Sequence, residues 1–385
     1  MSEMKTAVRT AIIGTGGMGR KYAQMILTGM VPGLEMTAMV CRSGSAKAWA
    51  EEMNALIPAG KSAPKIFDSA AELFAEPDLY DAVLIVTPHR THPELAKQAF
   101  ALGKHVLCDK PAGIKAEDAA DMCRAAEENK VLFAMMFQQR TFPKYRTIKK
   151  ILEEGKLGTI RRMFMETTRY FRTEYYHESG SWRSSWSGEG GGLLINQAQH
   201  PLDVWQFLFG LPETVYAEIP FGKYNSFTVD DEATIVMRYA DGVTGTFIAS
   251  TGEAEWSERL SISGSKGKLV LTDNTLEVSM YSADSDEYRK TAKVTDGREL
   301  SITRTEEKFG PDDSGLAYVS MLKNFASAVL DGTELIAPGT AGEGALELMC
   351  ASYLSAWKMA RVSLPVDREE YREYLRKAVA ADMNM

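Results

Sequence analysis

Apolar and polar positions along the first third of the chain alternate between two patterns, one typical of strands and one typical of helices. Short apolar runs, typical of buried strands, alternate with longer stretches in which apolar residues recur every three or four positions, as in helices. The predicted strands are Val8–Ile13, Glu35–Cys41, Lys65–Phe67, Asp81–Thr87, His105–Cys108 and Val131–Met136. The predicted helices lie near residues 18–28, 45–54, 69–75, 92–102 and 116–129. This alternation predicts a doubly wound parallel sheet with helices on both faces, an α/β fold.

The pattern changes near residue 140. A helix is predicted over Pro143–Glu154, and glycines end it. Longer, half-alternating strands are predicted at Thr159–Phe171, Thr214–Glu218, Thr234–Tyr239, Val243–Ser250, Glu258–Ser263 and Lys268–Leu271. Asp241-Gly242 and Lys266-Gly267 predict hairpin turns between neighbours. Helices are predicted near 316–330, 341–360 and Asp367–Ala380, so this part is expected to be an α+β domain with an antiparallel or mixed sheet.

A glycine-rich motif lies at the end of the first predicted strand. Residues 14–19 form a G-x-G-x-x-G pattern that contains Gly14, Gly16, Gly17, Met18 and Gly19. Such glycines allow a tight turn, a close approach of backbone to a pyrophosphate, and close packing of helix on strand. The following helix offers free N–H groups to phosphates. We predict dinucleotide binding here; the alternative is a glycine turn that serves packing only.

Length and composition limit the classes of function. With 385 residues the chain is expected to form two domains, which we place at 1–140 and 141–385. The net charge of −8 (44 basic and 52 acidic residues) does not favour nucleic acid or an anionic membrane as a partner. Neither a bilayer-spanning apolar run nor a signal-peptide pattern is present in the sequence, so a cytoplasmic protein is expected. The four cysteines are predicted to be free thiols, and the five histidines lack the spacing of a metal site.

Further motifs follow in a recognisable order. They are Thr87-Pro88-His89-Arg90-Thr91-His92, Gly103–Pro111, Gln138-Gln139-Arg140 with Pro143, Gly190-Gly191-Gly192, and Asn196–Asp203. Together with the glycine motif, over essentially the whole chain, they resemble the Gfo/Idh/MocA family of glucose–fructose oxidoreductase and inositol dehydrogenase. The resemblance implies a Rossmann domain joined to a C-terminal domain with a large open sheet. It also implies hydride transfer between NAD or NADP and a sugar or cyclitol hydroxyl, in a homodimer or homotetramer built through that sheet.

The resemblance also implies site residues in the first domain. Thr87, Pro88, His92, Asp109 and Gln138 are expected to contact the cofactor. Asp109 stands where the family more often has glutamate.

Lys110 follows a strand at the carboxyl edge where the cofactor cleft of such sheets opens. Its ammonium is expected to hold the substrate oxygen and to lower the pKa of the reacting hydroxyl. The alternative is a solvated surface lysine.

His200 is the second candidate catalytic residue. Either residues 193–209 are helical, or the helix begins near Gln199 with Pro201 in its first turn. The family places this histidine at the reacting hydroxyl, whereas a histidine on an apolar helix is more often a core residue. Many members have aspartate at the position of Asn196. An amide cannot relay a proton, so Asn196 is expected to orient the substrate or His200.

Aromatic residues are concentrated in a polar, glycine-rich stretch before this motif. They include Tyr170, Tyr175, Tyr176, His177, Trp182, Arg183 and Trp186. Trp182 is expected to stack on a sugar face and Arg183 to bind hydroxyls or a carboxylate. The alternative is an oligomer contact or a loop packed over the sheet.

The end of the second predicted strand bears on cofactor choice. Cys41 stands where NAD-specific members usually have an acidic residue, and Arg42 and Ser43 are able to hold a 2′-phosphate. We therefore favour NADP; in the alternative, Arg42 stacks on adenine and NAD binds.

The leading hypothesis is an NAD(P)-dependent sugar or polyol dehydrogenase that uses no metal. A second is a glycoside-cleaving enzyme that oxidises its sugar transiently with NAD. A third is a cofactor-sensing regulator without catalytic activity.

Overall fold

The chain folds into two compact units. The computed structural model describes residues 6–55, 57–178, 180 and 182–382. The first unit comprises Met1–Thr141 and Asp313–Leu346, and the second comprises Phe142–Asp312 and Glu347–Met385. The sequence alone placed all of 141–385 in the second domain. Residues 313–346 instead return to the first unit, because the apolar side of their helix packs on its sheet.

The first unit is built on a parallel sheet. Within the described residues its strand order is β3-β2-β1-β4-β5-β6. The strands are β1 Val8–Ile13, β2 Leu34–Val40, β3 Lys65–Phe67, β4 Ala82–Ile85, β5 His105–Cys108 and β6 Phe133–Met135. Each pairs in parallel with its neighbour, so all carboxyl ends lie at one edge of the sheet. The doubly wound α/β prediction is confirmed.

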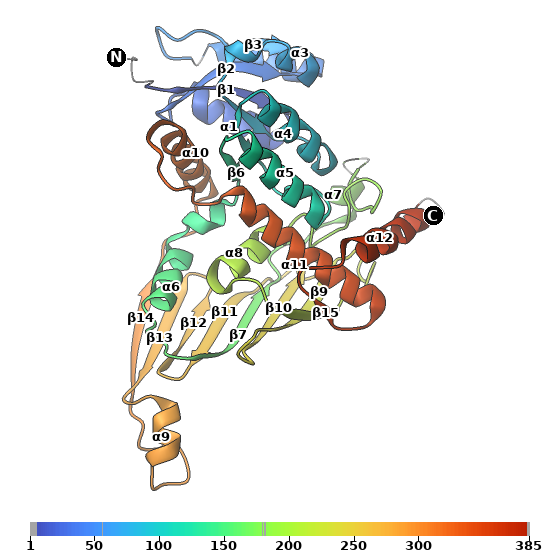
Figure 1. Cartoon of the computed structure of the whole chain (residues 1–385). Helices are drawn as coiled ribbons and strands as arrows, with labels where there is room; N and C mark the ends of the chain where they lie inside the picture. Colours follow the sequence, from blue (N-terminus) through green and yellow to red (C-terminus); the bar gives the residue numbers. More distant parts are fainter. Residues whose placement is uncertain (1–5, 56, 179, 181, 383–385) are drawn as a thin grey trace. The chain divides into compact units, whose positions relative to one another are not determined.

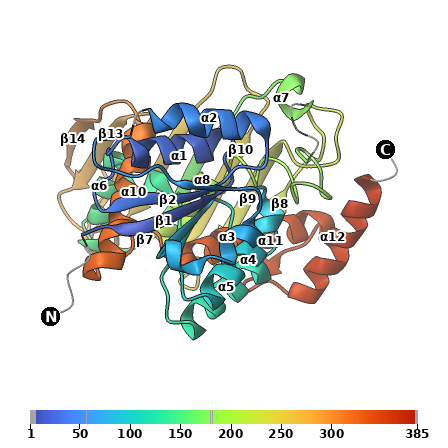
Figure 2. The same cartoon turned by 90° about the horizontal axis from the view of Figure 1, so that it is seen from above.

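Helices cover both faces of this sheet. Figure 2 shows α1 and α2 on one face and α3, α4 and α5 on the other. The helices of the unit are α1 Gly17–Leu27, α2 Gly44–Asn54, α3 Ala70–Phe74, α4 His92–Ala101, α5 Ala116–Glu128 and α10 Ser314–Asp331. Short 3-10 segments lie at η1 Pro77–Leu79, η2 His89–Thr91 and η3 Gln138–Thr141. Helix α10 contacts β1 and β2, and its Tyr318 packs edge-on against Tyr22 of α1 with ring centroids 5.3 Å apart.

The second unit contains a large mixed sheet. Its order in the described chain is β14-β13-β12-β11-β7-β10-β9-β8-β15 (Figure 1). The strands are β7 Ile160–Thr167, β8 Thr214–Glu218, β9 Glu232–Arg238, β10 Thr244–Ser250, β11 Glu258–Gly264, β12 Gly267–Thr272, β13 Thr275–Tyr281, β14 Ile302–Lys308 and β15 Val362–Ser363. Strands β7 and β10 pair in parallel, and the other neighbouring pairs are antiparallel. The predicted α+β domain with a mostly antiparallel sheet is confirmed.

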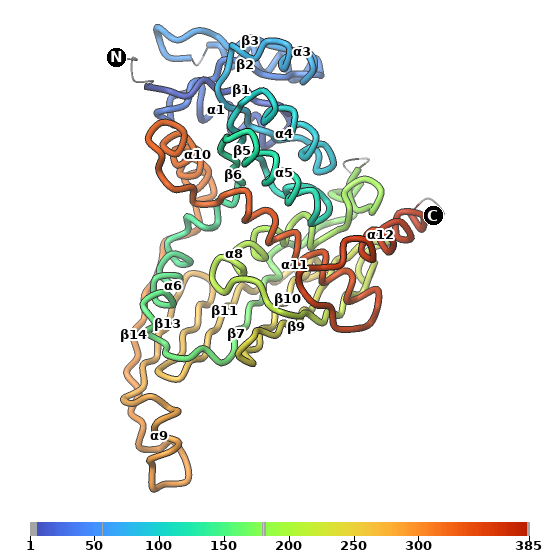
Figure 3. Tube along the Cα trace, viewed as in Figure 1, coloured from blue at the N-terminus to red at the C-terminus, as the bar shows by residue number. Residues whose placement is uncertain are grey.

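One face of this sheet is covered and the other is open. Within the unit, α6 Pro143–Glu153, α8 Gln199–Phe209 and the later turns of α11 Gly339–Lys358 lie along one face (Figure 3). The buried residues of β9 alternate with exposed ones, so Ala233, Ile235 and Met237 point to the helices. Short helices α7 Glu174–Glu178 and α9 Ser285–Thr291 lie in connections, and α12 Arg368–Asp382 ends the described chain.

The predicted hairpins are present, and several elements were missed. Asp241-Gly242 joins β9 to β10, and Lys266-Gly267 lies between β11 and β12. The predicted strand Thr159–Phe171 was too long, because β7 ends at Thr167. Strands β13, β14 and β15 and helices α7 and α9 were not predicted. All seven residues of β14 are exposed, so no apolar alternation marks this edge strand.

A buried lysine fastens several segments of the second unit together. The ammonium of Lys144, at the start of α6, lies 2.8 Å from Asp312 Oδ2 and 3.3 Å from Glu258 Oε2. Arg169 contacts the same two carboxylates, and the Tyr145 hydroxyl donates to Glu258 Oε1 at 2.7 Å. A buried ion pair is stable only when its charges are satisfied in this way. Lys144 and Asp312 lie near the two ends of the continuous segment Phe142–Asp312 of this unit, so the cluster holds those two ends together.

The cysteines are free thiols, as predicted from the sequence. All four cysteines are free, and burial raises the pKa of the Cys41 and Cys108 thiols. Among the described helices, none has the length and apolar character needed to cross a membrane.

Candidate active site

The glycine motif forms a turn in which Gly14 and Gly19 have no room for a side chain. At Gly16 and Gly17 the space where a side chain would begin is empty of protein atoms. Gly14 has φ +102°, and a Cβ there would lie 2.2 Å from the carbonyl oxygen of Val86. A Cβ on Gly19 would lie 1.7 Å from the Gly14 carbonyl oxygen, so helix α1 touches the turn after β1. Gly16 and Gly17 are exposed, and a Cβ on either would meet nothing within 4 Å. The space at Gly16 and Gly17 is what a pyrophosphate requires.

The start of helix α1 is suited to an anion. The helix begins at Gly17 after an N-cap glycine that has no side-chain cap, and its first turn contains no acidic residue. The first N–H groups of a helix have no partner within the helix, and its dipole places partial positive charge there. Phosphate oxygens are the ligands that such an end prefers.

Positively charged side chains lie between the end of β2 and the start of helix α2. Cys41 is fully buried, which encloses its thiol, whereas Arg42 is exposed. Ser43 caps α2 by accepting a hydrogen bond from Ala46 N at 3.1 Å. Arg20 of α1 reaches this corner, with a terminal nitrogen 3.5 Å from Ser45 Oγ. This corner therefore offers two guanidinium groups and two hydroxyls, and no exposed carboxylate at position 41.

His92 holds two loops at the carboxyl edge of the sheet together. Its side chain is buried, with Nδ1 2.7 Å from the Pro111 carbonyl oxygen and Nε2 2.6 Å from that of Thr87. Burial lowers the pKa of His92. Thr87 Oγ1 lies 2.6 Å from Thr91 Oγ1, which follows the Pro88 turn. The resemblance implies that His92 contacts the cofactor. In the structure both ring nitrogens of His92 face backbone carbonyl oxygens of the turns after β4 and β5.

Asp109 and Lys110 follow β5 directly. Asp109 Oδ1 accepts a hydrogen bond from Lys110 N at 2.9 Å. Burial raises the pKa of Asp109 to about 6, although the Lys110 charge and a hydrogen bond from Tyr22 oppose that rise. Both residues are half-buried at the carboxyl edge, on the strand two places from β1. Lys110 is thus placed on the same edge as the glycine turn.

Gln138 adds a buried acceptor to this edge. The side chain lies in η3, and its Nε2 is 3.4 Å from the Tyr318 hydroxyl. Its Oε1 is buried and has no hydrogen-bond partner among the described residues. An amide donor on a bound molecule, such as the carboxamide of nicotinamide, would satisfy that oxygen. The residues of the first unit therefore fit a nicotinamide dinucleotide at both its phosphate and its amide groups.

In the second unit, a buried carboxylate holds the glycine-rich segment. Asp230 accepts hydrogen bonds from Gly192 N and Leu194 N at 2.7 Å each, and from the Tyr353 hydroxyl at 2.6 Å. A Cβ on Gly192 would lie 2.1 Å from the Asp230 carbonyl oxygen, so only glycine fits there. Burial raises the pKa of Asp230. The turn that carries Asn196 is fixed by these contacts.

Helix α8 begins at Gln199, so His200 and Pro201 lie in its first turn. Of the two alternatives drawn from the sequence, the later start is confirmed. His200 is half-buried, and Asn196 lies in the turn that precedes the helix. Asp203, one turn further on, is buried and accepts a hydrogen bond from the Gln206 side chain at 3.0 Å.

Glu189 is the carboxylate partner of Asn196, and it was not predicted. Its side chain is 2% exposed, and its Oε1 accepts a hydrogen bond from Asn196 Nδ2 at 2.5 Å. Its Oε2 accepts from Ser184 N at 2.9 Å. A carboxylate accepts hydrogen bonds only, so it faces the amide nitrogen and the Asn196 oxygen takes the other side. A carboxylate seven residues before Asn196, within the glycine-rich approach, was the available signal in the sequence.

The aromatic loop contains one cluster and one core residue. The Arg183 guanidinium lies 4.7 Å from the ring centroids of both Tyr176 and Trp182, and it donates to the Tyr176 hydroxyl at 2.8 Å. That hydroxyl is also 3.3 Å from Asn196 Nδ2, so the cluster adjoins the candidate catalytic turn. Trp186 is instead buried among aromatic residues of the helical layer.

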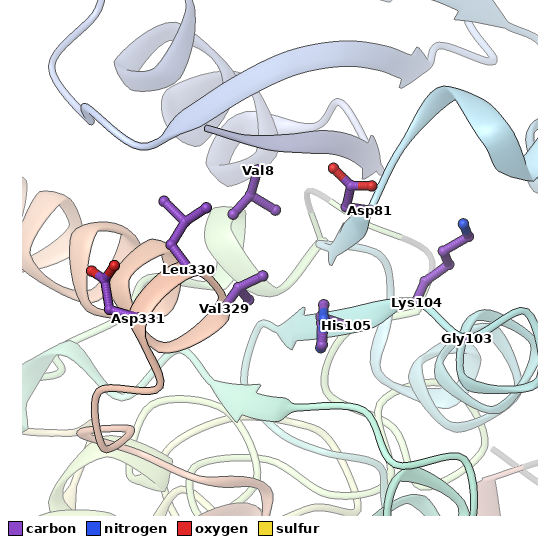
Figure 4. Close-up of a pocket in the computed structure, with 8 residues that line it drawn as sticks. All are labelled: Val8, Asp81, Gly103, Lys104, His105, Val329, Leu330 and Asp331. Atoms are coloured by element: carbon purple, nitrogen blue, oxygen red, sulfur yellow. The ribbon is translucent and has the colours of Figure 1, made fainter. Parts of the chain in front are cut away.

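A cavity of about 410 Å³ in the first unit is separate from these groups. Val8, Asp81 and His105 line it at the amino ends of β1, β4 and β5, together with residues 329–331 of α10 (Figure 4). The glycine turn and Lys110 lie at the opposite, carboxyl edge of the same strands. In the described residues, no cluster of histidine, cysteine or acidic side chains is able to hold a metal ion.

Two family models match the chain, each over one of its parts. A model of an oxidoreductase family, NAD-binding Rossmann fold, matches residues 8–137, and a Gfo/Idh/MocA C-terminal domain model matches residues 145–270. The chain belongs to the Gfo/Idh/MocA oxidoreductase family. The first match covers the whole parallel sheet of this Gfo/Idh/MocA protein, and the second covers β7 to most of β12.

Individual relatives support the same placement. Trans-1,2-dihydrobenzene-1,2-diol dehydrogenase of Bos taurus is 30% identical over 212 residues, 54% of this chain and 60% of that protein's length. The scyllo-inositol 2-dehydrogenase (NADP(+)) IolU of Bacillus subtilis is 28% identical over 265 residues, 69% of this chain and 76% of IolU. The WlbA dehydrogenase of Bordetella pertussis, solved with NADH and UDP-GlcNAcA, superposes with TM-score 0.78 at 22% identity, covering 94% of this chain and 99% of its own. The last likeness shows the fold.

The two kinds of glycine in the turn give a testable contrast. We expect Gly19→Ala to destabilise the first unit by about 3 kcal/mol or more, because its methyl group meets backbone that cannot yield. Gly17→Ala has open space, so it is expected to fold normally and to bind NAD(H) and NADP(H) more weakly. Thermal unfolding and cofactor titration separate the two effects. Equal cofactor affinity of Gly17→Ala and the parent would contradict phosphate binding at this turn.

Proposed function

We propose that this Gfo/Idh/MocA protein is an NADP-preferring dehydrogenase that transfers hydride between nicotinamide and a secondary hydroxyl of a sugar, sugar derivative or cyclitol. The observation that carries the proposal is the shared carboxyl edge of the parallel sheet. The glycine turn after β1 and Lys110 after β5 both lie at that edge, with the buried Gln138 acceptor in the same unit. The relative IolU, a scyllo-inositol 2-dehydrogenase (NADP(+)), supports the proposal.

The proposed chemistry assigns separate tasks to the residues. NADP, when bound, accepts or supplies the hydride. Lys110 holds the substrate oxygen and lowers the pKa of the hydroxyl, and His200 or Lys110 takes its proton as the hydride leaves the carbon. Asn196 orients the substrate or His200 through its amide oxygen, and Glu189 sets the direction of that amide. Arg183 and Trp182 bind the sugar beside it.

The preference for NADP rests on the corner after β2. A ribose 2′-phosphate carries negative charge, which an acidic residue at position 41 would repel. Cys41 supplies no such charge, and Arg42, Arg20 and the start of α2 supply positive charge. In our proposal Arg42 pairs with the 2′-phosphate rather than stacking on adenine.

The open face of the large sheet supports a homodimer or homotetramer. By strand register, five apolar residues share the face opposite the buried one. Tyr216 and Val236 are exposed there, and Phe164, Ile248 and Val270 are half-buried. Apolar side chains gathered on one sheet face commonly mark an interface between subunits. We propose a cytoplasmic enzyme that assembles through this face.

A panel of sugars, cyclitols and glycosides with NAD and NADP tests the activity through the absorbance of the reduced cofactor. We expect Lys110→Ala to lower kcat by about 10²- to 10⁴-fold while cofactor affinity is nearly retained. Lys97→Ala, an exposed lysine of α4, serves as the control. Unchanged turnover in Lys110→Ala would remove Lys110 from the mechanism. Release of a sugar without net cofactor reduction would favour the glycoside-cleaving alternative.

Arg42→Gln tests the cofactor assignment. Loss of a charge-assisted hydrogen bond is expected to lower kcat/KM with NADP by about tenfold or more and to leave kcat/KM with NAD nearly unchanged. Arg124→Gln, an exposed arginine of α5, is the matched control. An equal loss with both cofactors would instead place Arg42 on the adenine.

An exchange of two residues tests the role of Glu189. Glu189→Gln is expected to lower kcat, because an amide partner no longer fixes the direction of Asn196. Asn196→Asp places two carboxylates in contact, which raises the pKa of one and displaces the pH–rate profile. The double variant Glu189→Gln/Asn196→Asp again has one carboxylate and one amide, and we expect it to recover kcat. A Glu189→Gln variant with the parent's kcat and pH profile would show that Glu189 only supports the fold.

A further inference from the structure

Two arginines of the second unit lie on one tyrosine ring. The Arg183 guanidinium is 4.7 Å from the Tyr176 ring centroid, and that of Arg172 is 5.0 Å away. Arg183 donates to the Tyr176 hydroxyl at 2.8 Å, and Arg172 donates to the Phe171 carbonyl oxygen at 2.9 Å. Within the described part of the chain, Arg183 forms no ion pair with a carboxylate.

His177 lies next to these arginines and Tyr176, and one of its ring nitrogens makes no hydrogen bond among the described residues. We call Arg172, Tyr176, His177 and Arg183 the arginine cluster. His177 Nε2 is enclosed and has no hydrogen-bond partner among the described residues. The other ring nitrogen of His177 lies 2.5 Å from Ser184 Oγ. When the Ser184 hydroxyl donates to Nδ1, His177 Nε2 carries an N–H. A buried donor without a partner costs free energy, which a bound acceptor would remove.

Two carboxylates, Asp231 and Glu189, border the cluster, and both accept hydrogen bonds from other groups. Those of Glu189 come from Asn196 Nδ2 and Ser184 N. Burial lowers the pKa of His177, and the charges of Arg172 and Arg183 lower it further, while Asp231 opposes them. Asp231 already accepts hydrogen bonds from Lys223 N, Tyr224 N and the Asn225 side chain. The acidic residues of helix α7 are exposed, and neither forms an ion pair with Arg183 in the described chain. They are Glu174 and Glu178.

The cluster is joined to the candidate catalytic turn through one hydroxyl. Tyr176 Oη accepts hydrogen bonds from Arg183 at 2.8 Å, and from Asn196 Nδ2 and Gln197 Nε2 at 3.3 Å each. A group bound by the arginines would therefore lie within the span of one sugar ring from Asn196. Planar guanidinium groups bind carboxylate and phosphate oxygens through paired hydrogen bonds, which hydroxyl groups cannot match.

We propose that Arg183 and Arg172 form an anion subsite, so that the substrate is an acidic sugar whose carboxylate or phosphate group lies about one ring away from the reacting hydroxyl. Tyr176 holds the two guanidinium groups in place, and His177 supplies a third donor. This inference rests on the proposed function for the reaction itself, but the subsite binds its anion without any transfer of hydride.

Binding and turnover are measured separately to test the subsite. Matched sets of a neutral aldohexose, its uronate and its 6-phosphate, in the gluco, galacto and manno series, are titrated calorimetrically into the full chain with NADP+ present. We expect at least one acidic sugar to bind about tenfold or more tightly than its neutral counterpart, with an affinity that falls as NaCl is raised. The uronate and phosphate arms identify which anion is preferred.

Variants assign that preference to the arginines. Arg183→Gln is expected to weaken binding of the acidic sugar far more than binding of its neutral counterpart, and so to remove most of the preference. Arg183→Lys is expected to retain part of that preference. Arg304→Gln, on the exposed strand β14, is the control and is expected to keep the full preference. Thermal unfolding confirms that each variant is folded.

The outcomes separate this inference from the proposed function. Acidic sugars that bind no more tightly than neutral ones, or a preference that survives Arg172→Gln and Arg183→Gln together, would overturn the subsite. Charge-dependent binding without hydride transfer would uphold the subsite and contradict the dehydrogenase. Hydride transfer from neutral sugars without a charge preference would uphold the dehydrogenase and contradict the subsite.

Discussion

The tightest constraint in the molecule is the approach of helix α1 to the turn after β1. The Gly14 carbonyl oxygen occupies the place where a side chain of Gly19 would begin, so the first turn of the helix lies against the end of the strand. That approach turns the free N–H groups of the helix toward the carboxyl edge of the sheet, where Lys110 and the His92-bonded loops also lie. The second unit uses the same device at Gly192, which touches the Asp230 backbone and so fixes the turn that carries Asn196.

Carboxylates organise the candidate residues within each unit. Asp109 binds the backbone of Lys110, Glu189 directs the amide of Asn196, and Asp230 receives three hydrogen bonds from the glycine-rich segment and Tyr353. Glu189 and Asp230 are buried and Asp109 is half-buried, and removing a carboxylate from water is costly unless its oxygens are satisfied. Because carboxylates accept and do not donate when charged, each one also fixes which atom of its partner faces it. Glu189 thereby places a carboxylate beside the turn that carries Asn196.

Much of the fold could be predicted because local patterns carry it. Strands β1, β3 and β5 were predicted to the residue, since short apolar runs between turn residues mark buried parallel strands. Strand β14 was missed, because a strand exposed on both faces leaves no alternation in the sequence. Strand β13 was missed although Leu276, Val278 and Met280 alternate with polar residues in it. The return of α10 to the first unit was missed as well. An apolar helix face shows that a helix packs, but not on which unit it packs.

The sequence by itself determined the glycine turn, the identities of Lys110 and His200, the absence of an acid at position 41, and the alternation of elements that places them at strand and helix ends. These follow from spacing along the chain, which the backbone geometry of turns and helices converts directly into position. Only the tertiary structure decided that Glu189 faces Asn196, that Tyr318 of α10 meets Tyr22 and Gln138, and that Arg172 and Arg183 share one tyrosine ring. Such contacts form within loops and between elements, where residue spacing along the chain does not by itself fix position, and side-chain packing brings the residues together.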